Sequence, residues 1–221
     1  MRTYPLFRGA AIATLGTYAI LRNSSEPNWI FDVLLFNAVA LFAVISILIS
    51  PIPDDHLGRV GVSLAIALWT MGSIASSISS FFTFSIQVNF DLVADISYSL
   101  FYPLALFGVT RSLIHRTISR SLELLDTVIV TLGITTIVAA FLIRPAMENI
   151  SGSTFEVFLA ILYPVGDVVL FIATLVMVLI RPLSWRSALL LLGITIYTVA
   201  DFYFLYLSQK GIYELGASTD M

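Results

Sequence analysis

Cysteine is absent from the 221 residues, which excludes disulfides, thiolate metal sites and a cysteine nucleophile. Charge is also scarce, because Asp, Glu, Lys and Arg make up 11% of the chain whereas 58% of the residues are hydrophobic. A soluble domain of this length needs far more polar residues to cover its surface, so the composition excludes that class. The segments of alternating hydrophobicity that are typical of a membrane β-barrel are missing too.

Continuous apolar stretches dominate what is there. Each is about 20 residues long, which matches the roughly 30 Å hydrocarbon layer of a bilayer at about 1.5 Å of rise per helical residue. Lipid offers the backbone no hydrogen-bond partners, so we predict an all-α, polytopic transmembrane helix bundle that forms one membrane-embedded domain over residues 1–221. The predicted spans, about seven, cover residues 5–21, 29–50, 60–84, 92–110, 123–146, 155–180 and 187–208, with turns at 51–59 and 148–154.

Lysine and arginine are spread unevenly over the predicted loops, and cytoplasmic loops carry the excess of these residues. Eight lie on the N-terminal side of the membrane and three on the other side, so we expect a cytoplasmic N-terminus. The eight are Arg2, Arg8, Arg59, Arg111, Arg116, Arg120, Arg181 and Arg186, and the three are Arg22, Arg144 and Lys210. Trp29 and Trp185 fall at predicted span ends, where indole rings favour the membrane interface.

Three pairs of segments indicate an internal duplication. Thr-Leu-Gly at 14–16 matches 131–133, DVLLF at 32–36 matches DVVLF at 167–171, and residues 68–84 align with 189–205. Spans 1–3 thus correspond to spans 5–7, and a repeat of four helices is parallel rather than inverted. We expect repeat units at about 1–115 and 120–221, the second lacking its last helix.

Two aspartates lie near the middle of predicted spans, Asp167 in the sixth and Asp201 in the seventh. Inserting each of them at the bilayer centre costs about 2.5–3.5 kcal/mol of free energy, so a functional or structural role must account for each. One hypothesis is a proton- or ligand-responsive pair that is neutral in one state and charged in another. The other is a protonated residue that only joins helices, hydrogen-bonded to Tyr163, Tyr197 or Tyr203.

Two Tyr-Pro pairs place proline inside a predicted span, one in the fourth and one in the sixth. Proline frees a backbone carbonyl and favours a kink, which either improves packing or opens space beside a moving element. The candidate ligand-binding or switch residues are therefore Asp167, Asp201, Tyr163, Pro164, Tyr102 and Pro103.

Small residues recur every four positions in the third span, at Gly72, Ser76 and Ser80. That spacing lets two helices approach closely. We expect helix packing at this stripe rather than an ion path.

Four further aspartates, Asp32, Asp91, Asp95 and Asp126, lie near predicted span ends. The helix macrodipole favours a carboxylate in the first turn, and we assign Asp91 and Asp126 to that role. Asp32 and Asp95 have the same interpretation, with the alternative that they line an outward-facing cavity.

Catalytic and metal-binding patterns are missing. His56 and His115 are the only histidines, and both lie in predicted loops, so we expect no metal site. No G-x-S-x-G, H-E-x-x-H or P-loop pattern occurs. The only lysine, Lys210, lies past the last span, where it is not placed to bind retinal. We predict no enzymatic activity and no cofactor.

Five segments in order carry a resemblance to a known family: DISYSLFYPL at 95–104, LLD at 124–126, YPVGD at 163–167, ADFY at 200–203 and GIYELG at 211–216. Together they resemble the multi-spanning N-terminal membrane region of bacterial GGDEF and GGDEF–EAL proteins, which make or break cyclic di-GMP. The resemblance covers residues 91–221. It implies a sensor in the bacterial inner membrane that feeds a cytoplasmic cyclase or phosphodiesterase domain. The GGDEF sequence itself does not occur in this chain.

Two functions are consistent with the sequence. The first is a noncatalytic sensor and anchor whose bundle packing controls a cytoplasmic output domain. The second is a small-solute or ion transporter or channel component that uses the intramembrane aspartates. The expected partner is the lipid bilayer, and a small ligand in the bundle or a homodimer are further options. Nucleic acid is not expected, because the basic residues form no patch.

Overall fold

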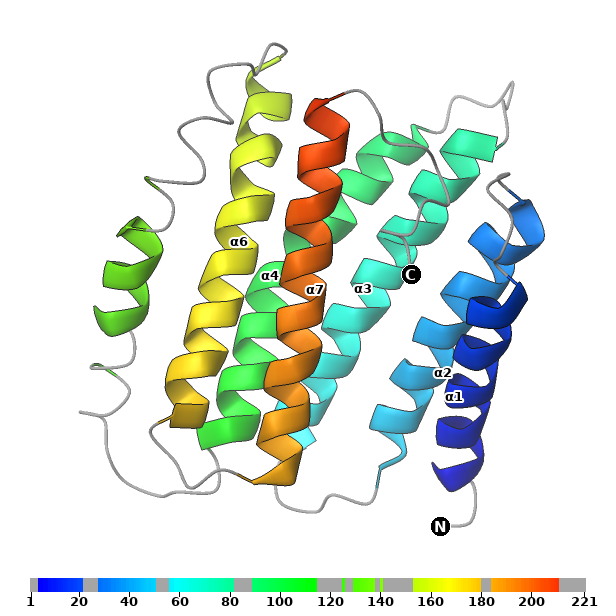
Figure 1. Cartoon of the computed structure of the whole chain (residues 1–221), viewed down its shortest axis with the longest axis horizontal. Helices are drawn as coiled ribbons and strands as arrows, with labels where there is room; N and C mark the ends of the chain where they lie inside the picture. The colour runs from blue at the N-terminus through cyan, green and yellow to red at the C-terminus, as the bar shows by residue number, and fades with distance from the viewer. Residues whose placement is uncertain are drawn as a thin grey trace. The chain divides into compact units, whose positions relative to one another are not determined.

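The computed structural model describes residues 4–21, 28–50, 56–81, 89–114, 125, 129–137, 140, 153–179 and 184–210. Within these ranges all regular secondary structure is helical, which confirms the all-α prediction for this part of the chain (Figure 1). The helices are α1 (Tyr4–Leu21), the π-helix η1 (Ile30–Leu35), α2 (Phe36–Leu48), α3 (His56–Phe81), α4 (Phe90–Ile114), α6 (Thr154–Leu179) and α7 (Trp185–Gln209), and residues 129–137 are helical as well.

Five helical segments are long and apolar enough to cross a bilayer. They are Ile30–Leu48, His56–Phe81, Phe90–Arg111, Thr154–Leu179 and Trp185–Ser208. They match five of the predicted spans with ends shifted by a few residues. The first predicted span is present as a shorter apolar helix, Pro5–Leu21. The span predicted at 123–146 is described only in part, so the total of seven spans stays a prediction.

The turn predicted at 51–59 ends earlier than expected, because α3 already begins at His56. Arg59 therefore lies in the first turns of α3. Its guanidinium donates a hydrogen bond to the backbone carbonyl of Ser50. A long arginine side chain can reach beyond the helix end in this way, and here it ties the end of α2 to the start of α3.

Polar side chains cap the helices that follow. The Asn89 side-chain oxygen accepts from the Leu92 N–H at 3.1 Å before α4. At α6, Ser153 Oγ accepts from the Glu156 N–H at 3.3 Å. At α7, Ser184 Oγ accepts from the Ser187 N–H at 3.2 Å. Each of these caps satisfies a backbone donor that lacks a partner within its helix, and so fixes where the helix begins.

The chain divides into two compact units. Unit 1 comprises Met1–Gly108 and Tyr213–Met221, and unit 2 comprises Val109–Ile212. The boundary falls inside α4. The single domain expected over residues 1–221 stays a prediction.

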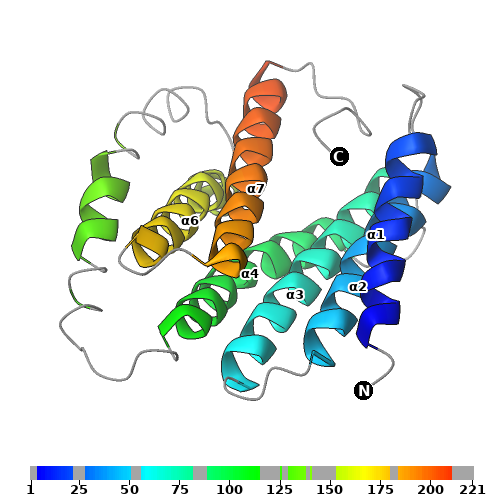
Figure 2. The same cartoon turned by 60° about the horizontal axis from the view of Figure 1, so that its bottom comes forward.

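In unit 1, α1, α2 and α3 lie side by side (Figures 1 and 2). Three aromatic rings join them at one level. The ring centroids of Tyr18 and Phe36 lie 5.8 Å apart, and those of Phe36 and Trp69 lie 5.9 Å apart. Tyr18 is 2% exposed. Tilted ring pairs at this separation are favourable, so the cluster fixes the three helices relative to one another.

The contact between α3 and α4 is close because glycine lies at the crossing. A Cβ built on Gly108 would lie 2.5 Å from the Val62 backbone nitrogen. Further along, a Cβ on Gly72 would lie 2.8 Å from the Tyr98 ring. The packing role predicted for the stripe of small residues is thus present at Gly72, whereas Ser80 is exposed and donates to the Ser76 carbonyl.

The matched segments of the proposed duplication differ locally where both are described. Asp32 lies in a π-helix near the start of its span, whereas Asp167 lies in the middle of the regular helix α6. Gly72 is crowded by Tyr98, whereas the matched Gly193 has nothing within 4 Å of the position of a Cβ. The duplication stays a prediction.

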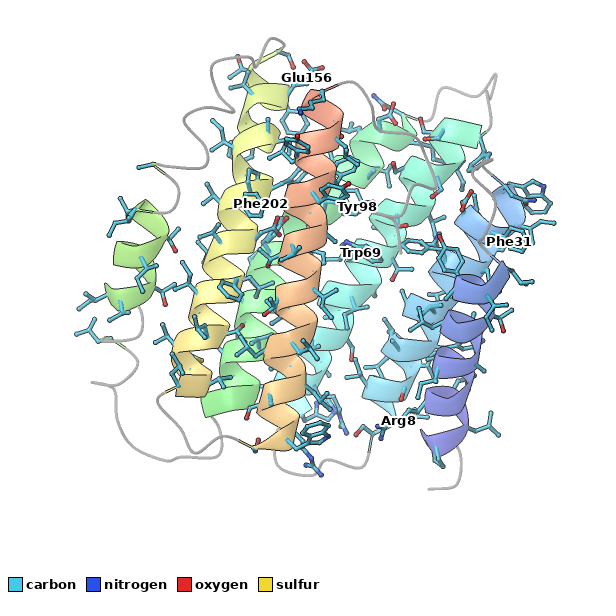
Figure 3. The ribbon with its side chains drawn as sticks, viewed as in Figure 1. Arg8, Phe31, Trp69, Tyr98, Glu156 and Phe202 are labelled. Carbon is cyan, nitrogen blue, oxygen red and sulfur yellow. The ribbon has the colours of Figure 1, made fainter. Side chains whose placement is uncertain are left out.

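In unit 2, α6 and α7 pack against each other and run in opposite directions (Figure 1). Val168, Ile172 and Val176 on α6 form a buried apolar cluster, and Phe171 and Phe202 pack against it. Phe202 lies on the side of α7 that faces α6 (Figure 3). This apolar contact positions the two aspartates of the candidate site.

Candidate functional site

The two mid-span aspartates meet at the contact between α6 and α7. Asp167 is 2% exposed, and Asp201 is partly buried. The Asp201 carboxyl lies within hydrogen-bonding reach of the Asp167 carboxyl and the Tyr197 hydroxyl. Tyr197 lies one helical turn before Asp201, the spacing at which side chains on one helix meet. The structure therefore brings together two of the predicted site residues, with one of the three tyrosines that we considered as partners.

A hydrogen bond between two carboxyl groups requires a proton. An ionised carboxylate has only acceptors, so the pair must carry at least one proton to make this bond. The pair then has two accessible charge states at this geometry, one proton with a single negative charge or two protons with none. Because the two groups interact directly, their protons belong to the pair rather than to either residue.

Apolar side chains that join the two helices lie next to the pair in the sequence. Val168 follows Asp167 directly, Phe202 follows Asp201 directly, and both belong to the apolar contact between the helices. Electrostatic interactions are strong where water and polar groups are scarce. A change in the number of protons on the pair therefore changes the electrostatic energy of the contact between α6 and α7.

The other tyrosines and the proline considered in unit 2 differ in their burial. Tyr163 is half-buried one turn before Asp167, and Pro164 is buried. α6 continues through Pro164 without interruption. Tyr203 is 49% exposed and stacks on Tyr206 with ring centroids 6.4 Å apart.

The other Tyr-Pro pair, Tyr102 and Pro103, belongs to unit 1. Tyr102 is 8% exposed and packs edge-on against Phe101, with centroids 5.1 Å apart. Pro103 is exposed, and α4 runs through it as a continuous helix.

The aspartates near span ends lie in different surroundings. Asp91 is exposed in the first turn of α4, as the N-terminal assignment predicts. Asp32 Oδ2 accepts from the Asn28 N–H at 2.8 Å, which is a capping interaction. Asp95 is half-buried within α4. Asp126 and His115 lie outside the described residues, so their predicted roles are not addressed by the structure.

Thr198 is a member of the site that the sequence analysis missed. Most threonines in these helices donate to the carbonyl four residues earlier, as Thr174 does to Leu170 at 2.7 Å and Thr195 does to Leu191 at 2.7 Å. The buried Thr198 hydroxyl has no partner among the described residues, and it lies three residues before Asp201, on the same side of α7. Its spacing of three residues from Asp201 is the sequence feature that predicts a place beside that carboxyl.

No group of three metal-ligating side chains occurs among the described residues. No protein-family model, curated protein or solved structure matches the chain. The chemistry of the aspartate pair is therefore the basis on which a function can be proposed.

Proposed function

We propose that the chain is a noncatalytic membrane sensor and anchor module in which the number of protons on the Asp167–Asp201 pair sets the packing of α6 against α7. The observation that supports it is the approach of the two carboxyls to within hydrogen-bonding reach at a helix contact where Asp167 is buried. Intramembrane ionisable residues are costly, and a direct contact between two of them is a functional candidate with its partner identified.

The switch follows from the charge states of the pair. With one proton, the two carboxyls share a hydrogen bond, and the Tyr197 hydroxyl can donate to the negative charge. Loss of that proton would place two negative charges side by side, which repel and favour separation of the helices. Two packings of α6 and α7 that differ in bound protons are the two states that a sensor needs.

Transmission to an output domain rests on the family resemblance. On that basis we propose a bacterial inner-membrane protein whose packing change controls a diguanylate cyclase or phosphodiesterase domain. The excess of arginine on the N-terminal side supports a cytoplasmic N-terminus. Pro164 and the Tyr102-Pro103 pair are the proposed moving elements, because a proline inside a helix leaves a carbonyl without its helical donor.

The absence of cysteine permits a direct test. Spin labels on Phe158→Cys and Tyr206→Cys, which are 54% and 50% exposed, report the separation of α6 and α7. In lipid nanodiscs, the distance distribution should change over a pH series from mildly acidic to mildly alkaline. Asp201→Asn keeps the size of the side chain but cannot ionise, so it should abolish the change.

Asp91→Asn is the matched control, because Asp91 is exposed at the start of α4. It should leave the pH-dependent change intact. Two results would show that the aspartate pair only joins the helices. One is a distance between the labels that does not respond to pH when both aspartates are present, and the other is a pH response that survives Asp201→Asn.

Proton-coupled transport is the second candidate, and the buried Thr198 hydroxyl beside the pair favours it. A hydroxyl that does not bond to its own helix can bind a water or a solute next to the carboxyls. Proton uptake into liposomes that contain the chain, abolished by Asp167→Asn, would support transport. A pH-dependent distance change without proton flux would support the sensor.

A further inference from the structure

A second polar site lies in unit 1, where the π-helix η1 passes into α2. Two polar residues are buried there, Asp32 at 8% exposure and Asn37 at 3%. They belong to the apolar span Ile30–Leu48, whose other residues have few polar atoms to offer. π-helical turns cost stability and occur mostly at functional sites, so this turn needs an explanation.

The wide turn puts the two polar side chains on one face. In a regular α-helix, residues five apart are rotated by about 140° from each other, because each residue turns the chain by about 100°. Here the Phe36 N–H bonds to the Phe31 carbonyl, five residues back, so five residues make about one turn. Asp32 and Asn37 therefore lie one above the other, and both are buried.

The orientation of the Asn37 side chain is fixed. Its Nδ2 donates to the Val33 carbonyl at 2.8 Å, which identifies the other atom as Oδ1. Oδ1 is buried and has no hydrogen-bond partner among the described residues. A buried carbonyl oxygen without a donor is costly, and in native proteins it indicates a ligand, ion or water.

The surroundings of this oxygen favour a positive charge. Asp32 supplies a carboxylate on the same face, and its Oδ2 accepts from the Asn28 N–H. Phe36 directly precedes Asn37, and its ring contacts those of Tyr18 on α1 and Trp69 on α3. Figure 3 shows Phe31 and Trp69 on neighbouring helices of this unit.

We propose that Asp32 and Asn37 form an oxygen-lined site for a small monovalent cation. Carboxylate and amide oxygens are hard ligands, which suit alkali ions and ammonium. One carboxylate neutralises one positive charge, whereas a divalent ion would leave a net charge in an apolar region. This site is independent of the aspartate pair in unit 2.

Trp69 provides the reporter for the test. The chain has three tryptophans, so Trp29→Phe with Trp185→Phe leaves Trp69 alone. In this background, the whole chain in nanodiscs is titrated with NaCl, KCl or ammonium chloride, and choline chloride keeps the ionic strength constant. At least one of the three cations should change Trp69 emission with a saturating dependence, and choline should not.

Asn37→Leu should raise the half-saturating concentration by about tenfold or more, because it removes the liganding oxygen at similar volume. Asn89→Ser is the matched control, since Asn89 is exposed and serine retains the cap of α4. It should leave the titration unchanged. If Asn37→Leu does not fold, Asp32→Asn takes its place, because it keeps an oxygen for the Asn28 N–H but removes the charge, and it too should raise the half-saturating concentration by about tenfold or more.

Three results would overturn the proposal. The first is the absence of a saturating response to any monovalent cation, which would mean that Asn37 Oδ1 bonds to a water instead of a cation. The second is an unchanged half-saturating concentration in the variants. The third is tighter binding of Mg²⁺ than of every monovalent ion, which would contradict the charge argument.

Discussion

Replacing Gly108 by alanine tests how closely α3 and α4 approach. The added Cβ would lie 2.5 Å from the Val62 backbone nitrogen and 2.8 Å from the Gly61 carbonyl carbon. Both atoms belong to the backbone of α3, so no side-chain rotation relieves the clash and the helices must separate. Overpacking of this kind costs about 1–3 kcal/mol.

Gly16→Ala is the matched control, because nothing lies within 4 Å of its Cβ position. Both substitutions gain the same helix propensity, up to about 1 kcal/mol, so this term cancels when the two are compared. Gly108→Ala should therefore be about 1–3 kcal/mol less stable than Gly16→Ala. Reversible unfolding in mixed detergent micelles, followed by circular dichroism, measures the difference.

Val62→Ala sharpens this test. It removes the Val62 Cγ2 atom, which lies 2.8 Å from the Gly108 Cβ position, but leaves both backbone contacts. In the Gly108→Ala background it should recover little stability. Equal stability of Gly108→Ala and Gly16→Ala, or full recovery by Val62→Ala, would refute the close backbone approach.

Three further predictions concern other helix contacts and ends. Gly72→Ala meets only the Tyr98 ring, which can rotate, so in the same unfolding assay it should cost less than Gly108→Ala. Ser184→Ala removes the capping box of α7 and should destabilise the chain by about 0.5–2 kcal/mol, with faster hydrogen exchange in the first turn of that helix. Trp185 is 77% exposed at the start of α7, so lipids brominated near the headgroup should quench its fluorescence more strongly than that of Trp69.

The membrane-crossing helices could be predicted because their signal is local. An apolar stretch of about 20 residues identifies a span without any knowledge of its neighbours. The ends were less certain, because single side chains set them. Asn89 and Ser184 cap α4 and α7 just before their first turns, and Arg59 extends from α3 to the Ser50 carbonyl.

The contact between Asp167 and Asp201 could be predicted from the sequence. Consecutive helices joined by a short turn run antiparallel, and residues equally far from the turn face each other. The predicted spans end at residue 180 and begin again at residue 187, so Asp167 lies 13 residues before this turn and Asp201 lies 14 residues after it. Helix spacing also favours Tyr197 over Tyr203 as the partner of Asp201, because residues four apart lie on one face of a helix whereas residues two apart do not.

The π-helical turn could not be predicted. No residue in the segment 30–35 breaks an α-helix, and one added residue per turn leaves the apolar pattern of a span unchanged. The sequence therefore placed Asp32 near a helix start without connecting it to Asn37. The close contact of Gly108 with Val62 could not be predicted either. It depends on the relative rotation of α3 and α4, which no local sequence pattern determines.

The two polar sites make a joint prediction, because they use different residues in different units. Mutations at separate sites that share no partners have additive effects. Asn37→Leu should thus weaken the cation response of Trp69 but leave the pH-dependent distance between α6 and α7 unchanged. Asp201→Asn should abolish the pH-dependent distance change but leave the cation response unchanged, and the double variant should show both effects. Loss of both responses in either single variant would mean that the sites are coupled, and the coupled element would then be sought in α4, the helix that contains the boundary between the units.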